Sequence, residues 1–592
     1  MTGALQTATD GMSRRAVLAA TAAGVTGASS GCVEEVASSL NGLTDDRMML
    51  SITTLPADGD REGVQIARAL RENLEALGAT VSIDMRRRSQ YRSSILLTND
   101  FDIFVGEVHD IHEPDVLYEM LHSSYAKEAG EQNPFGFANR TFDQLLERQR
   151  RVGPAARQQA VEDVLVAFAQ EQPFVPISLP TEVRLTRTDR FAGWSGPHLA
   201  SRIGYLGLDQ TGSSDTLNGV LTNSGPTQNL NPLTATYRDR GMIIDLVYDS
   251  LVMVDDGEVR PWLASSWEWE DGRVTLQLHS DLTFHDGHTL TADDVAFTYR
   301  FLQDTSLGRT EVPSPAPRYR REVDMIDAIE VLDEETIALE TGIDPDVFEP
   351  TLTVPILPAH IWQQRIREHV NTIDQQEEGA MARAFRQGRH SLLTLDNVPA
   401  VGSGPYKFNE NSVRESLALT RFDNHFTTRD GVDLPSPVAT DIEISIAPSS
   451  ATAIGQVRNG VADVTVSRLG SYAINLLEPI ENPALKRVDS PIQTAYIVGF
   501  NTQRRPFTDP YFRSIVARLL DKGAIAEQIF EGHATPAALP LTEEWVPDRL
   551  AWDDGDPTVP FFGEEGDLDV DAAKQAVKSA GYDYVDDRLQ TR

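Results

Sequence analysis

The chain has almost no cysteine. Cys32 is the single cysteine among 592 residues. One thiol excludes an internal disulfide framework and any metal site built from several cysteines. The position of Cys32 is therefore more informative than its reactivity.

Basic residues are also scarce. The chain carries 52 Lys and Arg against 89 Asp and Glu, for a formal net charge of -37, and the acidic residues are spread along the sequence. A nucleic-acid partner is excluded, because phosphate contacts need clustered Lys and Arg. A solvated acidic surface suits a salt-loving microbe, since at 1 M salt the repulsion is screened within about 3 Å. An ordinary acidic secreted protein is the alternative.

No apolar run is long enough to span a bilayer, and the best candidate is an export signal. Ser13-Arg14-Arg15 precedes a short apolar stretch, and small residues lead up to Gly31-Cys32. This order resembles a twin-arginine (Tat) signal ending in a lipobox. We expect residues 1–31 to be the signal, Cys32 to become the lipidated N-terminus, and 32–47 to be a tether. A disordered start with a chance cysteine is the alternative.

The folded part begins near Met48, where the sequence shows strand patterns alternating with helix patterns. Met48 to Thr53 reads as a strand, and Arg61 to Leu77 has apolar residues at helical spacing closed by Gly78. A Gly- and Ser-rich linker at 207–216 separates this region from many short strands. Helical spacing returns at 513–529 and 570–580. Strands alternating with helices indicate an α/β fold.

Catalytic signatures are missing. Outside the expected signal at residues 1–31, the chain has no GxSxG, HExxH, Walker loop or cysteine nucleophile, so we expect no enzyme. Phe284-His285-Asp286-Gly287 places an acid beside a base, but we interpret it as a structural turn that needs Gly287.

A dense series of motifs from Leu217 onward resembles the family 5 extracellular solute-binding proteins, the oligopeptide, dipeptide and nickel binders of ABC importers. The matching pieces follow the family order: Asn231-Pro232, Val247-Tyr248-Asp249-Ser250-Leu251, Pro261-Trp262-Leu263-Ala264-Ser265-Ser266-Trp267, Phe284-His285-Asp286-Gly287, Leu290-Thr291-Ala292-Asp293-Asp294-Val295, Leu357-Pro358-Ala359-His360, Val401-Gly402-Ser403-Gly404-Pro405-Tyr406, Asn459-Gly460, Ala462-Asp463, Gly499-Phe500-Asn501, Pro506-Phe507, Arg513 and Ala580-Gly581-Tyr582. The resemblance implies a two-lobed periplasmic-binding-protein-like α/β fold, type II and of the large peptide-binder class, with a cleft between the lobes.

The family pattern continues beyond Ala-Gly-Tyr, and its remaining elements occur here at the other end of the chain, from Met48 to Pro176. We interpret the chain as a circular permutant. Lobe II would then consist of residues 48–179 and 496–592, and lobe I of residues 180–495. The rival explanation, a truncated gene copy fused to a second one, predicts missing or duplicated elements, and neither is found.

The resemblance also implies a binding site. Peptide-binding members hold the ligand's ammonium group with an aspartate that corresponds to Asp110. Gly106, Glu107 and Val108 would bind an extended ligand through their main chain, opposite Thr236, Tyr237 and Arg238 on lobe I. Asp110 could instead cap the helix expected near Pro114. Glu107 stands where peptide binders often have an apolar residue, which favours a more cationic ligand.

His109 and His112 flank Asp110, and some members of the family carry nickel. A spacing of three in a loop is a poor metal signature, and surface histidines are the alternative. We therefore expect no metal and no cofactor.

Together these features predict a monomeric lipoprotein anchored at the extracellular face of the cell membrane. It would capture a peptide or a similar small polar solute and deliver it to an ABC permease and its ATPase. A surface sensor or chaperone that kept the fold without transport is the alternative from another class. A hydrolase is the third.

Overall fold

The computed structural model describes residues 47–196, 199–235, 241–255, 257–308, 313–373 and 391–591. The chain divides into residues 1–47 and residues 48–592. The expected signal and Cys32 lie outside the described residues, as do Thr236, Tyr237 and Arg238. Within the described ranges, no helix combines the length and the apolar character that a bilayer span requires.

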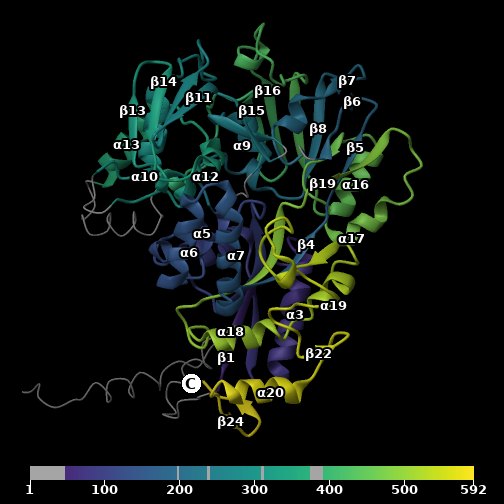
Figure 1. The fold of residues 1–592 in the computed structure, drawn as a ribbon. Helices are drawn as coiled ribbons and strands as arrows, with labels where there is room; N and C mark the ends of the chain where they lie inside the picture. The colour runs from purple at the N-terminus through teal and green to yellow at the C-terminus, as the bar shows by residue number, and fades with distance from the viewer. Residues whose placement is uncertain are drawn as a thin grey trace, which may run out of the picture. The chain divides into compact units, whose positions relative to one another are not determined.

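Lobe II, which contains the strands labelled β1 and β4 in Figure 1, is built on a six-stranded sheet with the order β2-β1-β3-β20-β4-β21. Strands β2, β1 and β3 run parallel, whereas β20 is antiparallel to both of its neighbours. The strands are β1 (Met49–Thr54), β2 (Thr80–Met85), β3 (Ile103–His109), β4 (Phe174–Pro180), β20 (Thr494–Phe500) and β21 (Ala534–Pro536). The helices of this lobe are α3 (Arg61–Ala76), α4 (Arg88–Arg92), α5 (Val116–Leu121), α6 (Arg140–Arg151), α7 (Pro154–Glu171), α18 (Pro510–Ala517), α19 (Lys522–Gln528) and α20 (Val570–Ser579).

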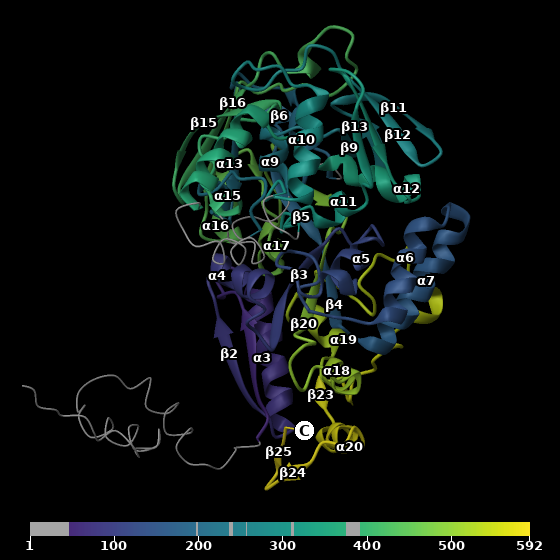
Figure 2. The same cartoon turned by 90° about the vertical axis from the view of Figure 1, so that its left-hand side faces the viewer.

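Both faces of this sheet are buried. Ile103 and Val105 belong to one apolar cluster, which includes the buried face of α3, while Phe104 belongs to a second cluster with residues of α5, α6 and α7. Successive residues of a strand point to opposite faces, so the sheet separates two cores. Figure 2 shows α3 on one side of the sheet and α5 to α7 on the other.

Lobe I contains a seven-stranded sheet with the order β15-β16-β17-β8-β18-β5-β19 and a four-stranded sheet with the order β11-β12-β14-β13. The strands of the larger sheet are β5 (Glu182–Arg187), β8 (Thr216–Leu221), β15 (Tyr406–Ser412), β16 (Ser416–Arg421), β17 (Asp441–Ile446), β18 (Val464–Thr465) and β19 (Leu485–Ser490). Those of the smaller sheet are β11 (Ala264–Glu270), β12 (Arg273–Leu278), β13 (Ala328–Val331) and β14 (Thr336–Glu340).

The helices of lobe I are α8 (Ile203–Leu206), α9 (Met242–Val247), α10 (Ala292–Gln303), α11 (Arg320–Asp324), α12 (Pro345–Phe348), α13 (Ala359–Ile373), α15 (Ser391–Thr394), α16 (Ser450–Arg458) and α17 (Ser471–Ile474). Paired short strands complete the described part of the protein: β6 (Phe191–Ala192) with β7 (Asp209–Gln210), β9 (Val252–Asp255) with β10 (Glu258–Pro261), β22 (Gly563–Glu564) with β23 (Asp567–Leu568), and β24 (Tyr584–Val585) with β25 (Arg588–Leu589). In lobe I, one apolar cluster includes residues of both the seven-stranded and the four-stranded sheet.

Two short connections join the lobes. The chain passes from β4 to β5 between Pro180 and Glu182, and from β19 to β20 between Ser490 and Thr494. Because β4 neighbours β20 in one sheet and β5 neighbours β19 in the other, the two connections run close together. Such a paired crossing is a natural hinge for lobe movement.

Lobe II takes its strands from distant parts of the sequence. Strands β1 to β4 come from residues 49–180, while β20 and β21 come from residues 494–536. The Met48 N–H donates to the Leu589 carbonyl at 2.8 Å, and the Leu589 N–H donates to the Gly78 carbonyl at 3.0 Å. The last strand pair therefore lies against the beginning of β1.

Candidate functional site

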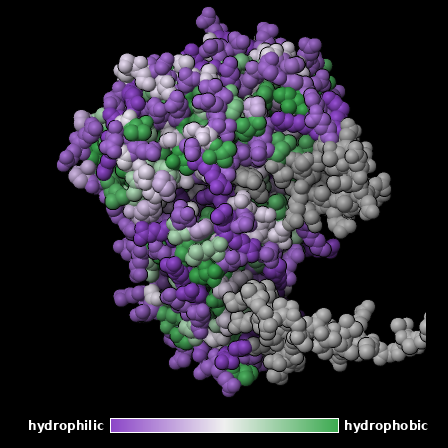
Figure 3. Space-filling model, turned by 180° about the vertical axis from the view of Figure 1, so that it is seen from behind, coloured by the Kyte–Doolittle hydropathy of each residue, from purple (hydrophilic) through white to green (hydrophobic). Residues whose placement is uncertain are grey.

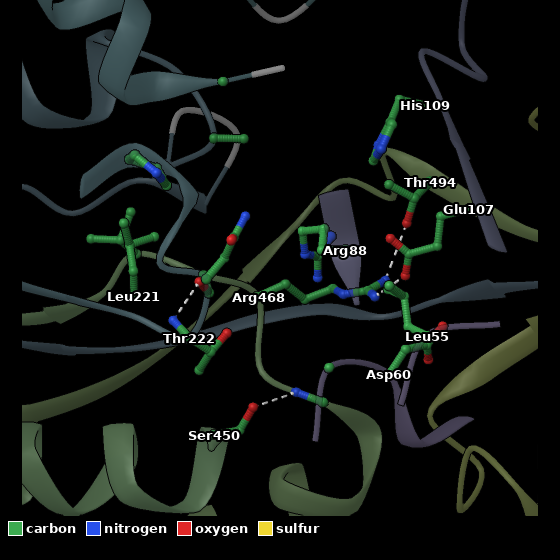
Figure 4. Close-up of a pocket in the computed structure, with 18 of the residues that line it drawn as sticks. Leu55, Asp60, Arg88, Glu107, His109, Leu221, Thr222, Ser450, Arg468 and Thr494 are labelled. Carbon is green, nitrogen blue, oxygen red and sulfur yellow. Dashed lines mark hydrogen bonds and ion pairs between the residues drawn. The ribbon is translucent and has the colours of Figure 1, made fainter. Parts of the chain in front are cut away.

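A cavity of about 420 Å³ is lined by residues from both lobes. Lobe II contributes the loop before α3 and part of β3, and lobe I contributes β5, the loop after β8 and the loop after β18 (Figure 4). Acidic and basic side chains occur together on the wall, in contrast to the strongly acidic chain as a whole. The charged lining residues are Asp58, Asp60, Arg61, Glu62, Arg88, Arg92, Glu107, Glu182, Arg184 and Arg468.

An ion pair bridges the two lobes inside this cavity. Arg468, which follows β18 of lobe I, donates from Nη2 to Oε1 of Glu107 on β3 of lobe II. Its Nη1 donates to the Thr494 hydroxyl at 3.1 Å. Burial opposes the charge of Arg468, but the nearby carboxylates of Glu107 and Glu182 outweigh it and raise the pKa of the guanidinium. Glu107, the residue that departs from the apolar pattern, thus has a cationic partner across the cavity.

Asp60 is a second acidic group on the wall. It precedes α3 and accepts hydrogen bonds from the Gly63 N–H and the Tyr496 hydroxyl, both at 2.8 Å. Burial, followed by repulsion from Glu107, raises the pKa of the Asp60 carboxyl from 3.8 to about 6. A cationic ligand group beside Asp60 would lower this pKa again, since an opposite charge favours the ionised carboxylate.

The predicted residues 106–110 are divided between two pockets. Gly106 and Glu107 line the large cavity, whereas Val108 and Asp110 line a smaller pocket of about 130 Å³. Glu107 and His109 line both. Asp110 has a φ of +60°, a left-handed conformation that aspartate tolerates better than most residues.

The helix-cap alternative for Asp110 does not match the position of the helix. Helix α5 begins at Val116, and Asp115 is the residue before it. The Asp115 carboxylate accepts from Arg150 Nε at 2.6 Å and Arg150 Nη2 at 2.8 Å, and both side chains are buried. This charged pair fixes the start of α5. The sequence contains no local pattern that links these two residues.

Strand β3 extends past its pairing with β1 at the cavity. Its pairs with β1 end at Thr53↔Phe104, while its pairs with β20 continue to His109. Tyr91 packs across this edge and donates from its hydroxyl to the Val105 carbonyl at 2.7 Å. A Cβ on Gly106 would lie 2.2 Å from the Tyr91 hydroxyl oxygen, so only glycine fits there. In the described part of the chain, no strand pairs with β3 on this side after Phe104.

The two histidines considered for a metal have different surroundings. His112 Nε2 bonds the Ile492 carbonyl, and its own carbonyl accepts from Trp545 Nε1 at 2.9 Å. His109 lines the cavity wall. Neither belongs to a metal-compatible group among the described residues.

His285, the base of the acid-base turn, has a structural role. Its Nε2 lies 2.9 Å from the Gly404 carbonyl, and its Nδ1 accepts from the Gly402 N–H at 3.2 Å. Burial lowers the pKa of His285 to about 4. A neutral ring with both nitrogens engaged holds the Gly-Ser-Gly-Pro-Tyr segment in place and is not available for proton transfer.

Neither Asp60 nor Arg468 is among the site residues expected from the sequence. Asp60 does carry a local signal, because it stands directly before a helix with apolar residues at helical spacing, as N-cap residues do. Arg468 carries none. It meets Glu107 from 361 positions away in the sequence.

Several curated proteins match part of this chain. The chain resembles heme-binding protein A of Haemophilus influenzae (23% identity over 349 residues, covering 57% of this chain and 56% of the relative) and the peptide transport periplasmic protein SapA of Salmonella typhimurium (25% over 360 residues, covering 58% and 60%). The chain thus spans somewhat more than half the length of these curated relatives.

Solved structures also match part of the chain. An oligopeptide-binding protein of Thermotoga maritima bound to mannohexaose has 23% identity and a TM-score of 0.45, with 63% of each chain covered. NikZ of Campylobacter jejuni in complex with Ni(L-His) has 18% identity and a TM-score of 0.43, with 64% of this chain and 65% of that chain covered.

The family profile of the bacterial extracellular solute-binding proteins, family 5 Middle, matches residues 258–591, more than half of the chain. These residues contain the turn at Phe284 and the bridging Arg468, and they reach the strand pair that lies against β1. The chain belongs to family 5 of the bacterial extracellular solute-binding proteins.

Proposed function

We propose that this chain is an extracytoplasmic solute-binding protein that captures a peptide or a similar small polar solute and delivers it to an ABC permease. The observation that carries the proposal is the cavity between the lobes, whose opposite walls are joined by the Glu107–Arg468 pair. A site shared by two hinged lobes couples ligand capture to closure.

The ligand would lie along the part of β3 that follows its pairing with β1. Main-chain groups of that strand provide hydrogen bonds to an extended chain, and Asp110 and Asp60 provide acidic groups for an ammonium. Main-chain recognition leaves ligand side chains weakly specified, so we expect a broad ligand range. Two relatives point the same way, since their names describe an oligopeptide-binding and a di/tripeptide-binding protein.

Native mass spectrometry of the protein purified without denaturation tests the ligand class, because a co-purifying peptide would appear as added mass. Titration with short peptides then measures affinity. Asp110→Ala should weaken an amine-bearing peptide at least tenfold, about 1.4 kcal/mol. Asp554→Ala is the matched control, since Asp554 also has positive φ (+53°) but is exposed and outside both pockets. Equal affinity in the two variants would refute the role of Asp110.

Transport is tested with the partner permease. A ligand-loaded importer component should stimulate the ATPase of the permease, whereas a sensor or chaperone would bind ligand and leave the ATPase unchanged. Cleavage of a bound peptide would instead establish a hydrolase.

We further propose that Cys32 is lipidated after export and anchors the protein at the extracellular face of the membrane. The order of paired arginines, apolar run and Gly31-Cys32 supports this. Mass spectrometry of the membrane fraction should find a diacylglyceryl group on Cys32. Cys32→Ala should release the protein into the medium, and a membrane-retained variant would refute the anchor.

The acidic composition suits a salt-rich medium. In Figure 3 hydrophilic residues cover most of the visible face, and hydrophobic residues form only small scattered groups. We propose that the protein stays monomeric and folded in molar salt, where its net charge of -37 is screened. Light scattering across a salt series checks this, and aggregation in molar salt would contradict it.

The circular permutation is also a proposal. It is supported by the rotated order of the family motifs and by the 2.8 Å contact of the Met48 N–H with the Leu589 carbonyl. A rearranged chain that joins residue 591 to residue 48 and opens in the 207–216 linker would restore the family order. We expect this rearranged chain to fold with an unchanged near-UV spectrum and to keep ligand affinity. Failure to fold would contradict the permutation.

A further inference from the structure

Away from the cavity, two histidines and an aspartate converge on lobe I. Asp286 and His288 lie on the turn between β12 and α10, and His360 lies in the first turn of α13. Their potential ligand atoms all lie within 4.8 Å of one another. In the part of the chain that the structure describes, this is the only such group of three His, Cys, Asp or Glu side chains.

The carboxylate of Asp286 faces both imidazoles. Its Oδ2 lies 2.8 Å from Nε2 of His360, and its Oδ1 lies 3.3 Å from Nδ1 of His288. The two imidazole rings stack, with centroids 3.9 Å apart and an interplanar angle of 22°. One carboxylate and two imidazole nitrogens, from two separate elements, thus lie within 4.8 Å of one another.

The turn that carries Asp286 and His288 is held by its own backbone. An isolated bridge pairs Thr283 with Thr289, and the Phe284 N–H donates to the His288 carbonyl at 2.8 Å. The His288 N–H donates to Asp286 Oδ1 at 3.2 Å. Two ligand-type side chains are therefore presented on a closed, short loop.

His360 is positioned from the other side. The Ala359 N–H donates to Asp294 Oδ1 at 3.0 Å, and Asp294 also forms the capping box of α10 with Thr291. This carboxylate fastens the start of α13 to the start of α10. The buried Phe284 ring packs edge-on against His360 at 5.7 Å. Because the backbone that carries these side chains is already held in place, binding a ligand here would cost little additional conformational entropy.

We propose that Asp286, His288 and His360 bind a divalent first-row transition-metal ion, with Zn²⁺ as the probe. Two imidazoles and one carboxylate are a donor set that suits Zn²⁺, Ni²⁺ and Cu²⁺, whereas Mg²⁺ and Ca²⁺ prefer oxygen donors. Metal–donor distances of about 2.0–2.2 Å place the donors roughly 3 Å apart. The Asp286–His360 and Asp286–His288 pairs already have about this spacing. The main adjustment is a rotation of the His288 ring out of its stack on His360, so that both nitrogens can point at one ion.

His288 is the residue to test, because its side chain is 61% exposed and its removal leaves the turn hydrogen bonds intact. Chelator-treated full-length protein is titrated with Zn²⁺ by calorimetry. We expect one ion per chain at this site and at least tenfold weaker binding in His288→Ala. His533→Ala is the matched control, since His533 is a histidine outside the group. It should bind Zn²⁺ like the wild type.

Co²⁺ provides a second measurement. The wild type and His533→Ala should show visible d–d absorption from a nitrogen- and oxygen-bound ion, and His288→Ala should lose it. Zn²⁺ should raise the Tm of the wild type and of the control but not of His288→Ala. A wild type that binds no Zn²⁺, or a His288→Ala variant that binds it equally well, would overturn the proposal.

Discussion

Asp60 on the cavity wall offers a sharp test of the electrostatics, through the substitution Asp60→Asn. Both of its hydrogen bonds, from the Gly63 N–H and from the Tyr496 hydroxyl, end on the same oxygen, Oδ1. An asparagine can present its amide oxygen in that position and still cap α3. The variant therefore removes a charge and keeps both acceptor contacts.

The expected change in the free energy of unfolding follows from the pKa of Asp60. Burial and the neighbouring Glu107 raise the pKa of Asp60 from 3.8 to about 6. One pKa unit corresponds to about 1.4 kcal/mol, so the full shift is worth at most ~3 kcal/mol. The side chain is only partly buried, and solvent screening reduces this to about 1–2 kcal/mol.

The sign is set by which state keeps the proton. Between pH 4 and pH 6 the folded protein still holds the Asp60 proton, which the unfolded chain has already released. This group therefore favours folding below about pH 4, and its contribution is lost as pH rises to about 6. Above that pH the ionised carboxylate weakens the fold, and the asparagine variant should be the more stable protein.

Urea unfolding of both proteins between pH 4.5 and 7.5, without ligand, measures this. The stability difference should grow with pH to about 1–2 kcal/mol in favour of Asp60→Asn at pH 7.5. Asp58→Asn, on the same loop and exposed, is the control for the loss of one negative charge from this loop. A difference for Asp60→Asn that does not change with pH, or a less stable variant at pH 7.5, would refute the reasoning.

Further substitutions test the site and the core. Gly106→Ala places a Cβ 2.2 Å from the Tyr91 hydroxyl oxygen and should cost about 1–3 kcal/mol in urea unfolding while weakening ligand affinity; unchanged affinity would remove this edge of β3 from the site. Arg468→Ala breaks the bridge between the lobes and should increase the radius of gyration of the ligand-free protein in small-angle scattering, whereas an identical profile would show that other contacts hold the lobes together. Lys522→Met leaves the buried Asp556 carboxylate without its cation and should cost roughly 3–5 kcal/mol; a loss below about 1 kcal/mol would contradict the importance of the pair.

Local patterns in the sequence predicted individual elements well. The strand expected at 48–53 is found as β1 at Met49–Thr54, and the helix expected at 61–77 is α3, Arg61–Ala76, followed by Gly78 at a φ of +90°. These elements depend on residues close in sequence, whose periodicity and capping are visible without a fold. The motifs from Leu217 onward likewise identified the family, which the profile match confirms.

The binding site was predicted only in part. Gly106, Glu107, Val108 and Asp110 were singled out from the family resemblance, and they line the two pockets, whereas the other three expected residues lie outside the described part of the chain. The sequence did not indicate that Glu107 lines both pockets whereas Asp110 lines only the smaller one. This division depends on the left-handed backbone at Asp110 and on the packing of Tyr91 over β3. Both are consequences of neighbours that approach in space.

The sequence by itself determined the secondary-structure periodicity, the acidic character and the family of this protein, since each of these is written in residue identity and short-range spacing. Only the tertiary structure decided which charges meet. Glu107 and Arg468 are 361 positions apart, and Asp286 and His360 are 74 apart. The strand order and the two crossings between the lobes bring such groups together, and the resulting burial sets their pairing and their pKa values, which no local pattern encodes.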